Sequence, residues 1–563
     1  MRASILSVCL GFVAACTSGR AELRGSSDGG EGGATISEGD AHFTLALAGA
    51  SESVGRLVGW NLGRGTYYAP AGDPYHPEWR TPERTATLAK LGEVRASGDS
   101  KPYVRFSGLQ IDGALGADGY HFWDFVKPGR GKAEADNLSV EEIDSIATEI
   151  GGELTITLNF GSGTAAEAAR YAAYLDGTDP TDPMVAARIA NGHADPYGVT
   201  VFEIGNESYG AWNTGATATG AYSYANPAAK NGGDPAWSGR PSSSAADFAA
   251  RALEYVRAVK SVVPGARFRV PLSQASMDAW GGLDVSIDLL RPLLVEPSVD
   301  AVVVHFYKAE DGETLGVSDF NAPEYAVAGS ELFRSRFLDL RGRLDALPRS
   351  SPLGIAVTEY HVADGIVRDR YTRGDTVAVG LGIADQWISF AELGIDHACQ
   401  HFSLAWDATQ DVLVEPWYDP IRPTGDGGVR ELPAYVVTRL LATHLLERRA
   451  TLTRITGPTA SAAFADAGVT FDAVHAVAFS SADGSTGSVA LLQRDPARSL
   501  TLTFDLEAGV SVTSVEQWAP ASLDENASDH VPVTVGTFRQ IGRRAEIVAP
   551  PHSVVGIRFE RRR

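Results

Sequence analysis

The chain has 563 residues, with Lys+Arg 48 and Asp+Glu 70, so its formal net charge at pH 7 is -22. Hydrophobic residues at 44% and charged residues at 21% are ordinary globular values, which exclude a disordered or collagen-like chain. The negative charge argues against nucleic acid as a partner, because binding to nucleic acid depends on clustered Lys and Arg. With only 3 cysteines, a disulfide framework is excluded too.

The first residues predict an export signal. Arg2 precedes a short apolar run, residues 5–15, which ends in Val-Ala-Ala directly before Cys16. This ending resembles a bacterial lipobox, so we expect a lipoprotein-type signal peptide over residues 1–16 with Cys16 lipidated; a plain secretory signal is the alternative. Residues 17–40 are rich in Gly and Ser and predict a flexible linker. We therefore expect an envelope protein, periplasmic or on the surface, that meets a membrane only through its lipid anchor.

Between residues 41 and 447, short β-rich runs alternate with longer Ala-rich stretches, which is typical of βαβ units around a parallel sheet. Eight β/α pairs predict an α/β fold, a (β/α)8 TIM barrel. The first helix opens with a capping-box pattern, Ser139 three residues before Glu142. The expected helices are 139–150, 164–175, 244–262 and 377–393. The expected strands are 56–61, 103–106, 153–159, 200–203, 267–271, 301–305, 355–358 and 397–402.

After residue 447 the helical pattern stops and short alternating runs follow, separated by turn residues. Such spacing is typical of a β-sandwich, which we expect over residues 448–563. A strand within residues 41–50 is a candidate to complete an edge of this sandwich. The expected strands are 474–480, 487–493, 500–506, 512–517, 544–548 and 554–559.

Two glutamates follow predicted barrel strands at their C-terminal ends, where barrel enzymes carry their chemistry. Glu207 follows the fourth strand and Glu359 the seventh. Two carboxylates about 5–5.5 Å apart are what retaining glycoside hydrolysis requires, one as acid/base and one as nucleophile. Each glutamate alone could equally be a solvated loop residue, so the prediction rests on the pair.

Neighbouring residues fit the same chemistry. Asn206 could bind a sugar 2-hydroxyl, Tyr307 could donate to the nucleophile, and Trp212 and Trp406 could stack on sugar rings. His305 lies on the sixth strand; a buried, hydrogen-bonded core histidine is its alternative role. The tryptophans could equally be packing residues.

These segments resemble clan A retaining glycosidases, and most closely the family 51 α-L-arabinofuranosidases. The run from Glu203 to Glu207 is similar to that family's acid/base segment, residues 301–307 to its His-x-Tyr strand, and Thr358-Glu359 to its nucleophile motif. The resemblance implies Glu207 as acid/base, Glu359 as nucleophile, a carbohydrate substrate such as a plant-type polysaccharide, and no cofactor.

The sequence departs from the family pattern around the sugar. The second strand of the family usually carries a Pro-Gly-Gly-Asn motif. Here that asparagine is missing after Arg105, and Gln110 or Asp112 is the candidate to replace it. The first strand presents Asn61 in place of a glutamate. The resemblance still implies substrate contacts from Asn61, Arg105, Gln110 and Asn159. Because the pocket is altered, a β-xylosidase, a β-glucuronidase, an endo-β-glucanase and a non-catalytic glycan-binding protein stay as alternatives.

Other catalytic classes find little support. No His-Glu-x-x-His motif occurs, and no Gly-x-Ser-x-Gly elbow follows a predicted strand, so neither a zinc site nor a serine nucleophile is indicated. We therefore expect no metal. The sequence does not indicate an oligomeric state.

Overall fold

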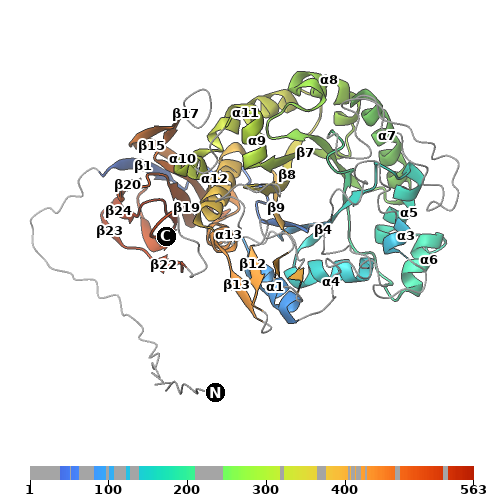
Figure 1. Cartoon of the computed structure of the whole chain (residues 1–563), viewed down its shortest axis with the longest axis horizontal. Coiled ribbons are helices and arrows are strands. Elements are labelled where there is room, and N and C mark those ends of the chain that lie inside the picture. The colour runs from blue at the N-terminus through green and yellow to red at the C-terminus, as the bar shows by residue number, and fades with distance from the viewer. Residues whose placement is uncertain are drawn as a thin grey trace, which may run out of the picture.

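The computed structural model describes most of the chain after the expected linker. The described residues are 39–50, 52–62, 82–96, 101–106, 122–126, 139–209, 245–317, 322–363, 376–402, 406–407, 412–413, 420–424, 428–462, 469–523 and 531–562. Within them, Figure 1 shows a barrel of strands surrounded by helices, with a smaller all-β unit packed against one side. No helix in these ranges is long and apolar enough to cross a membrane.

Eight parallel strands close into a barrel, as the sequence predicts, and β2 completes the ring by pairing with β9. Each strand lies within two or three residues of its expected start, and several run further at their C-terminal ends. The strands are β2 (Gly59–Leu62), β3 (Tyr103–Phe106), β4 (Glu153–Leu158), β5 (Val201–Ile204), β6 (Arg267–Gln274), β7 (Val299–Tyr307), β8 (Gly354–His361) and β9 (His397–Phe402).

The expected helices are present, and local signals explain where they begin. In α4, the amide of Glu142 donates to the Ser139 hydroxyl and the Glu142 carboxylate accepts from the Ser139 amide, so the capping box is complete. Thr164 and Glu167 form a second box at α5. The helices are α1 (Pro82–Glu93), α3 (Phe122–Phe125), α4 (Val140–Ile150), α5 (Ala165–Asp176), α6 (Pro183–Ala190), α7 (Ala245–Val262), α8 (Leu283–Leu294), α9 (Lys308–Thr314), α10 (Pro323–Ala328), α11 (Glu331–Asp345), α12 (Val377–Leu393) and α13 (Pro433–Thr443).

The C-terminal unit is a β-sandwich of a five-stranded sheet, in the order β15-β1-β20-β24-β23, and a six-stranded sheet, β14-β18-β19-β25-β21-β22. The strand expected within residues 41–50 is β1 (Ala41–Ala46), and it is an inner strand between β15 and β20. The other strands are β14 (Arg448–Arg449), β15 (Thr451–Thr456), β18 (Val474–Ser480), β19 (Thr486–Gln493), β20 (Leu500–Leu506), β21 (Val510–Trp518), β22 (Thr534–Val535), β23 (Phe538–Ile541), β24 (Arg544–Ala549) and β25 (Val554–Arg561). Small hairpins are formed by β10 (Trp406–Asp407) with β11 (Val412–Leu413), β12 (Ile421–Pro423) with β13 (Val429–Glu431), and β16 (Thr459–Ala462) with β17 (Val469–Asp472).

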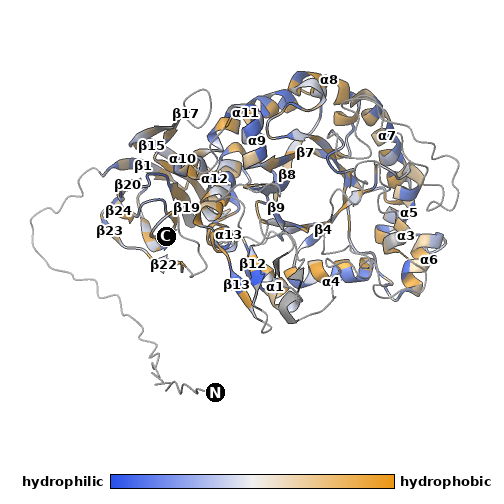
Figure 2. Ribbon diagram, viewed as in Figure 1, coloured by the Kyte–Doolittle hydropathy of each residue, from blue (hydrophilic) through white to orange (hydrophobic). Residues whose placement is uncertain are grey.

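The apolar core of the barrel extends to one face of the six-stranded sheet, and the sandwich has a second apolar core of its own. Figure 2 shows mixed polar and apolar faces on outer helices such as α4, whose apolar side packs inward. Helix α12 differs, because every residue from 377 to 391 is buried. Trp387 of this helix meets Phe479 of the sandwich edge-on, with ring centroids 6.1 Å apart. The helix therefore serves as the common wall of the two units.

Candidate active site

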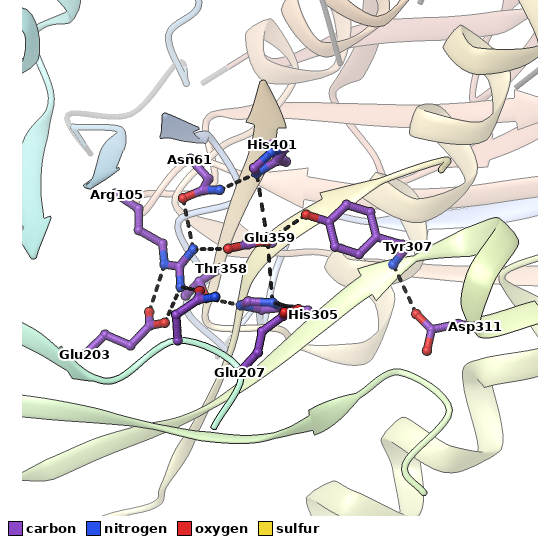
Figure 3. Close-up of polar contacts among 11 residues, drawn as sticks. Asn61, Arg105, Glu203, Glu207, His305, Tyr307, Asp311, Thr358, Glu359 and His401 are labelled. Carbon is purple, nitrogen blue, oxygen red and sulfur yellow. Dashed lines mark hydrogen bonds and ion pairs between the residues drawn. The ribbon is translucent and has the colours of Figure 1, made fainter. Parts of the chain in front are cut away.

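A buried arginine on β3, Arg105, joins the polar side chains at the C-terminal mouth of the barrel (Figure 3). Its Nε donates to Glu203 Oε2 over 2.9 Å, and its NH2 group donates to the other oxygen of the same carboxylate. Neither side chain of this ion pair is exposed to water. Such a two-pronged contact supplies the geometry that makes a buried ion pair tolerable.

The remaining donors of Arg105 reach other strands. NH1 donates to Asn61 Oδ1 over 2.9 Å and to Glu359 Oε1 over 2.5 Å, and NH2 also donates to Asn206 Oδ1 over 2.9 Å. Burial acts to lower the pKa of Arg105, but the charges of Glu203 and Glu359 outweigh it and raise that pKa above the ordinary value. Arg105 therefore stays a cation that orients its partners.

The two predicted glutamates lie close together, and both are nearly buried. One carboxylate oxygen of each, together with a ring nitrogen of His305, forms a group whose atoms all lie within 4.8 Å of one another. This spacing is near the separation of retaining glycosidases and well below the roughly 6.5–9.5 Å of inverting ones.

Glu359, on β8, is held as a carboxylate. Its Oε2 accepts a 2.6 Å hydrogen bond from the Tyr307 hydroxyl, and its Oε1 accepts from Arg105. Burial alone would raise its pKa, but the charges of His305 and Arg105 and the hydrogen bond from Tyr307 hold the pKa of Glu359 well below its usual range. An ionised, oriented oxygen is what a carboxylate nucleophile needs.

Glu207 lies just beyond β5 in a tight turn. Its backbone φ is 48°, a left-handed value that is uncommon for a residue with a side chain, and Gly205 before it has φ 77°. This turn directs the Glu207 side chain toward His305 and Glu359, and its Oε1 lies 2.7 Å from His305 Nδ1.

His305 links the two glutamates. Nδ1 lies 2.7 Å from Glu207 Oε1 and 3.5 Å from Glu359 Oε2, while Nε2 lies 3.2 Å from the Thr358 hydroxyl. Burial acts to lower its pKa, but Glu359 and Glu207 outweigh it, and the pKa of His305 is raised. His305 is thus fully buried, as its alternative role required, yet it contacts both candidate residues.

Among the described residues, Glu207, His305 and Glu359 form a group that could hold a metal ion by geometry. The guanidinium of Arg105 binds Glu359 and the Tyr307 hydroxyl donates to the same carboxylate. A cation would therefore compete with existing donors for Glu359, and the donor set does not favour it.

One further side chain completes the mouth. His401, at the end of β9, accepts at Nδ1 a hydrogen bond from Asn61 Nδ2, and its ring meets the Tyr307 ring edge-on with centroids 6.0 Å apart. Burial lowers the pKa of His401 to about 4, so the imidazole is neutral at pH 7. Its contribution is therefore hydrogen bonding and not charge.

Tyr307 is fixed through its backbone as well. Its amide donates to Asp311 Oδ2 over 3.0 Å, and the other oxygen of Asp311 accepts from the Ser276 amide over 2.9 Å. Burial raises the pKa of Asp311 to about 8. One carboxyl group thereby ties the end of β7 to the residues that follow β6.

The other expected site residues divide into two groups. Asn159 is described, and its side chain caps the turn after β4: Oδ1 accepts from the amides of Ser162 and Gly163, and Nδ2 donates to the Ser162 hydroxyl. Gln110, Trp212, Cys16 and the side chain of Trp406 lie outside the described residues.

Sequence reasoning missed Glu203, His401, Thr358 and Asp311 as members of this cluster. Glu203 carried a signal, because a charge inside the otherwise apolar strand Val201–Ile204 needs a buried partner. Arg105 sits on the next strand but one, and side chains from alternate strands fill one layer of a barrel.

No protein-family model matches the chain. Over 357 residues it is 24% identical to α-L-arabinofuranosidase C of Emericella nidulans, covering 59% of this chain and 61% of that protein. The chain thus spans about three fifths of the length of the curated relatives that it matches.

Two solved structures share nearly the whole fold. The α-L-arabinofuranosidase from Thermotoga maritima, in its arabinose complex, has a TM-score of 0.68 at 18% identity and covers 92% of this chain and 100% of its own. The family 51 arabinofuranosidase from Xanthomonas axonopodis pv. citri has a TM-score of 0.68 at 19% identity, covering 93% and 100%. At these identities the structures establish a common fold. With the curated relatives they confirm the resemblance to family 51.

The buried pair of Arg105 and Glu203 gives a stability prediction. Glu203→Gln removes the main counter-charge of a fully buried cation, so the free energy of unfolding should fall by about 3 kcal/mol or more. The matched control is Glu153→Gln, which breaks the half-exposed pair with Arg56 and should cost about 0–1 kcal/mol. Urea denaturation followed by circular dichroism measures both; equal losses would contradict the buried-pair explanation.

Proposed function

We propose that this protein is a retaining glycoside hydrolase with α-L-arabinofuranosidase activity, in which Glu207 is the acid/base and Glu359 the nucleophile. The observation that carries the proposal is the pair of nearly buried carboxylates at the barrel mouth, close enough for double displacement and placed in different surroundings. The names of the curated relatives support the choice of sugar.

In the first step, Glu359 attacks the anomeric carbon while Glu207 gives its proton to the leaving oxygen, so that the glycosidic bond breaks and a glycosyl ester forms. In the second step, Glu207 takes a proton from water, the water oxygen attacks the same carbon, and the ester bond to Glu359 breaks. The anomeric configuration is retained, and the enzyme returns to its starting protonation state.

The surroundings divide these roles between the glutamates. Glu359 accepts two hydrogen bonds, one from Arg105 and one from Tyr307, which suits a residue that must be an anion when substrate arrives. Glu207 has His305 as its near partner, a group able to donate to it or accept from it. Such a partner suits a residue that gains and loses a proton in every cycle.

The sugar pocket is lined by neutral hydrogen-bonding groups. Arg105 fixes the Oδ1 atoms of Asn61 and Asn206, which orients both amides. With the neutral imidazole of His401 and the hydroxyl of Tyr307, these groups suit the hydroxyls of an uncharged sugar. The pocket thus favours a neutral glycoside over a glucuronide.

Replacing the two glutamates tests the mechanism. Glu359→Gln should abolish release from every substrate, because no glycosyl ester can form. Glu207→Gln should slow release from an unactivated arabino-oligosaccharide by about 10²–10⁴-fold, and less from a nitrophenyl glycoside, whose leaving group needs little protonation. Rates on nitrophenyl α-L-arabinofuranoside, β-D-xyloside, β-D-glucoside and β-D-glucuronide measure both effects and the sugar preference.

The control for that experiment is Glu153→Gln, a barrel-strand carboxylate paired with Arg56, which should keep full activity. Proton NMR of the first-formed sugar should show retained configuration. Normal turnover by the Glu359→Gln variant would sink the two-glutamate mechanism. If the protein prefers another glycoside of this panel, the arabinofuranosidase assignment is wrong and that sugar is the substrate.

Tyr307→Phe tests the electrostatics of the nucleophile. The substitution removes one of the interactions that lower the pKa of Glu359, so that pKa should rise. Since Glu359 must be ionised to attack, kcat/KM falls as the pH drops through this pKa, and the acidic limb of the profile should move to higher pH.

The matched control is Tyr174→Phe, which removes a tyrosine hydroxyl bonded to Glu141 on the outer helices. Its pH profile should coincide with that of the unaltered protein. An acidic limb that stays in place in Tyr307→Phe would mean that the hydroxyl of Tyr307 does not stabilise the ionised nucleophile.

A further inference from the structure

Arg494, which directly follows β19 of the sandwich, reaches into the wall of the barrel. Only 2% of the residue is exposed. Its NH2 group donates to Asp385 Oδ1 over 2.7 Å and to His475 Nδ1 over 2.6 Å, and its NH1 group donates to Glu331 Oε1 over 2.7 Å. Asp385 and Glu331 belong to barrel helices, so this arginine is an ionic tie between the two units.

Asp385, on α12, connects Arg494 to Lys308 of the barrel. The side chain is fully buried, and its second oxygen accepts from Lys308 Nζ over 2.7 Å and from the Ser330 amide over 2.9 Å. Lys308 is fully buried too, and its Nζ also donates to the carbonyl of Ala326 over 3.1 Å. One carboxylate therefore binds two buried basic side chains, one from each unit, and each contact depends on its position.

Lys308 is the residue after Tyr307, at the point where β7 ends and α9 begins. The next residue of α12, Gln386, donates from Nε2 to the carbonyls of Phe306, over 3.1 Å, and of His361, over 3.0 Å. Phe306 directly precedes Tyr307, the last residue of β7, and His361 ends β8, the strand that carries Glu359. Two successive side chains of α12 thus hold both strand ends from outside the barrel.

The position of α12 makes it sensitive to the sandwich. Figure 1 shows this helix between β8 of the barrel and β19 of the sandwich. Its side chains are buried throughout residues 377–391, so it has no solvent-facing side on which to relax. If the contact between Arg494 and Asp385 changes, we therefore expect the contact between Asp385 and Lys308 to change too, because the helix has no exposed side that could adjust instead.

We propose that Arg494 is a positioning residue for the chemistry of the barrel: through Asp385 and Lys308 it fixes Tyr307 against the nucleophile Glu359. The sandwich then takes part in preparing the active site. This inference rests on the proposed function, since its main readout is the rate of sugar release.

The test is a double-mutant cycle of Arg494→Met and Tyr307→Phe. Arg494→Met should lower kcat by about 10-fold, with KM changed less than about twofold, because a displaced Tyr307 hydroxyl weakens the step and not substrate binding. The acidic limb of kcat/KM should move to higher pH, as in Tyr307→Phe. If Arg494 acts through Tyr307, the double variant is no slower than Tyr307→Phe alone.

The matched control is Arg449→Met. Arg449 also joins the sandwich to α12, donating to the carbonyl of Glu392 over 2.7 Å, but near the C-terminal end of the helix and without a contact to Asp385. The Arg449→Met variant should have a lower midpoint of thermal unfolding, with kcat and the pH profile of kcat/KM unchanged. All variants are assayed well below the midpoints of their own thermal unfolding. Arg494→Lys, which keeps the charge, should retain kcat. If Arg494→Met does not fold, Arg494→Gln takes its place in the cycle with the same expected loss of kcat.

A readout without turnover separates this inference from the proposed function. In protein labelled with 3-fluorotyrosine, the ¹⁹F resonance missing from Tyr307→Phe belongs to Tyr307, and it should shift in Arg494→Met but not in Arg449→Met. A protein that releases no sugar overturns the proposed function, while the resonance still tests the coupling. Unchanged kcat and an unchanged resonance in Arg494→Met, or multiplying effects in the cycle, would overturn the inference.

Discussion

A guanidinium that is shut off from water must find acceptors in the protein, and this requirement organises the mouth of the barrel. Arg105 takes its acceptors from β2, β5, the turn after β5 and β8. None of these can move without leaving a buried charge partly unpaired, at a cost of several kcal/mol. The strand ends that carry the chemistry are therefore fixed relative to one another before any substrate binds.

Two buried networks meet at the end of β7. The first faces the barrel axis and contains Arg105, Glu359 and the hydroxyl of Tyr307. The second faces outward and contains Lys308, Asp385 and Arg494. Tyr307 ends β7 and Lys308 begins α9, so the peptide unit between them belongs to both networks. The protein can thus connect a rigid outer scaffold to a reacting group without a flexible loop between them.

The sequence predicted what depends on local order. The capping box at Ser139 and the alternation of apolar runs are short-range signals, and the helices and barrel strands follow them closely. Glu207 and Glu359 could be chosen because a barrel sends every strand end to one mouth, so strand order alone brings them near each other.

What the sequence could not predict depends on partners far apart in the chain. The pairing of Arg105 with Glu203 spans 98 residues, and no motif announces it. His401 carries no local signal, because its partner Asn61 is 340 residues away. Asn159 had the right residue type, but its side chain is used by the adjoining turn, a local competition typical of asparagine.

The inner position of β1 has a consequence for how the molecule is made. His42 meets Asp505 across 463 residues, so the five-stranded sheet cannot be completed until nearly the whole chain has been synthesised. Closing so long a loop is slow, and the apolar side chains of Phe43 and Leu45 have no partner strand until it closes. The sandwich is therefore built from both ends of the described chain. If the two units were expressed separately at the boundary after residue 447, the sandwich would lose β1 and be left with a gap between β15 and β20.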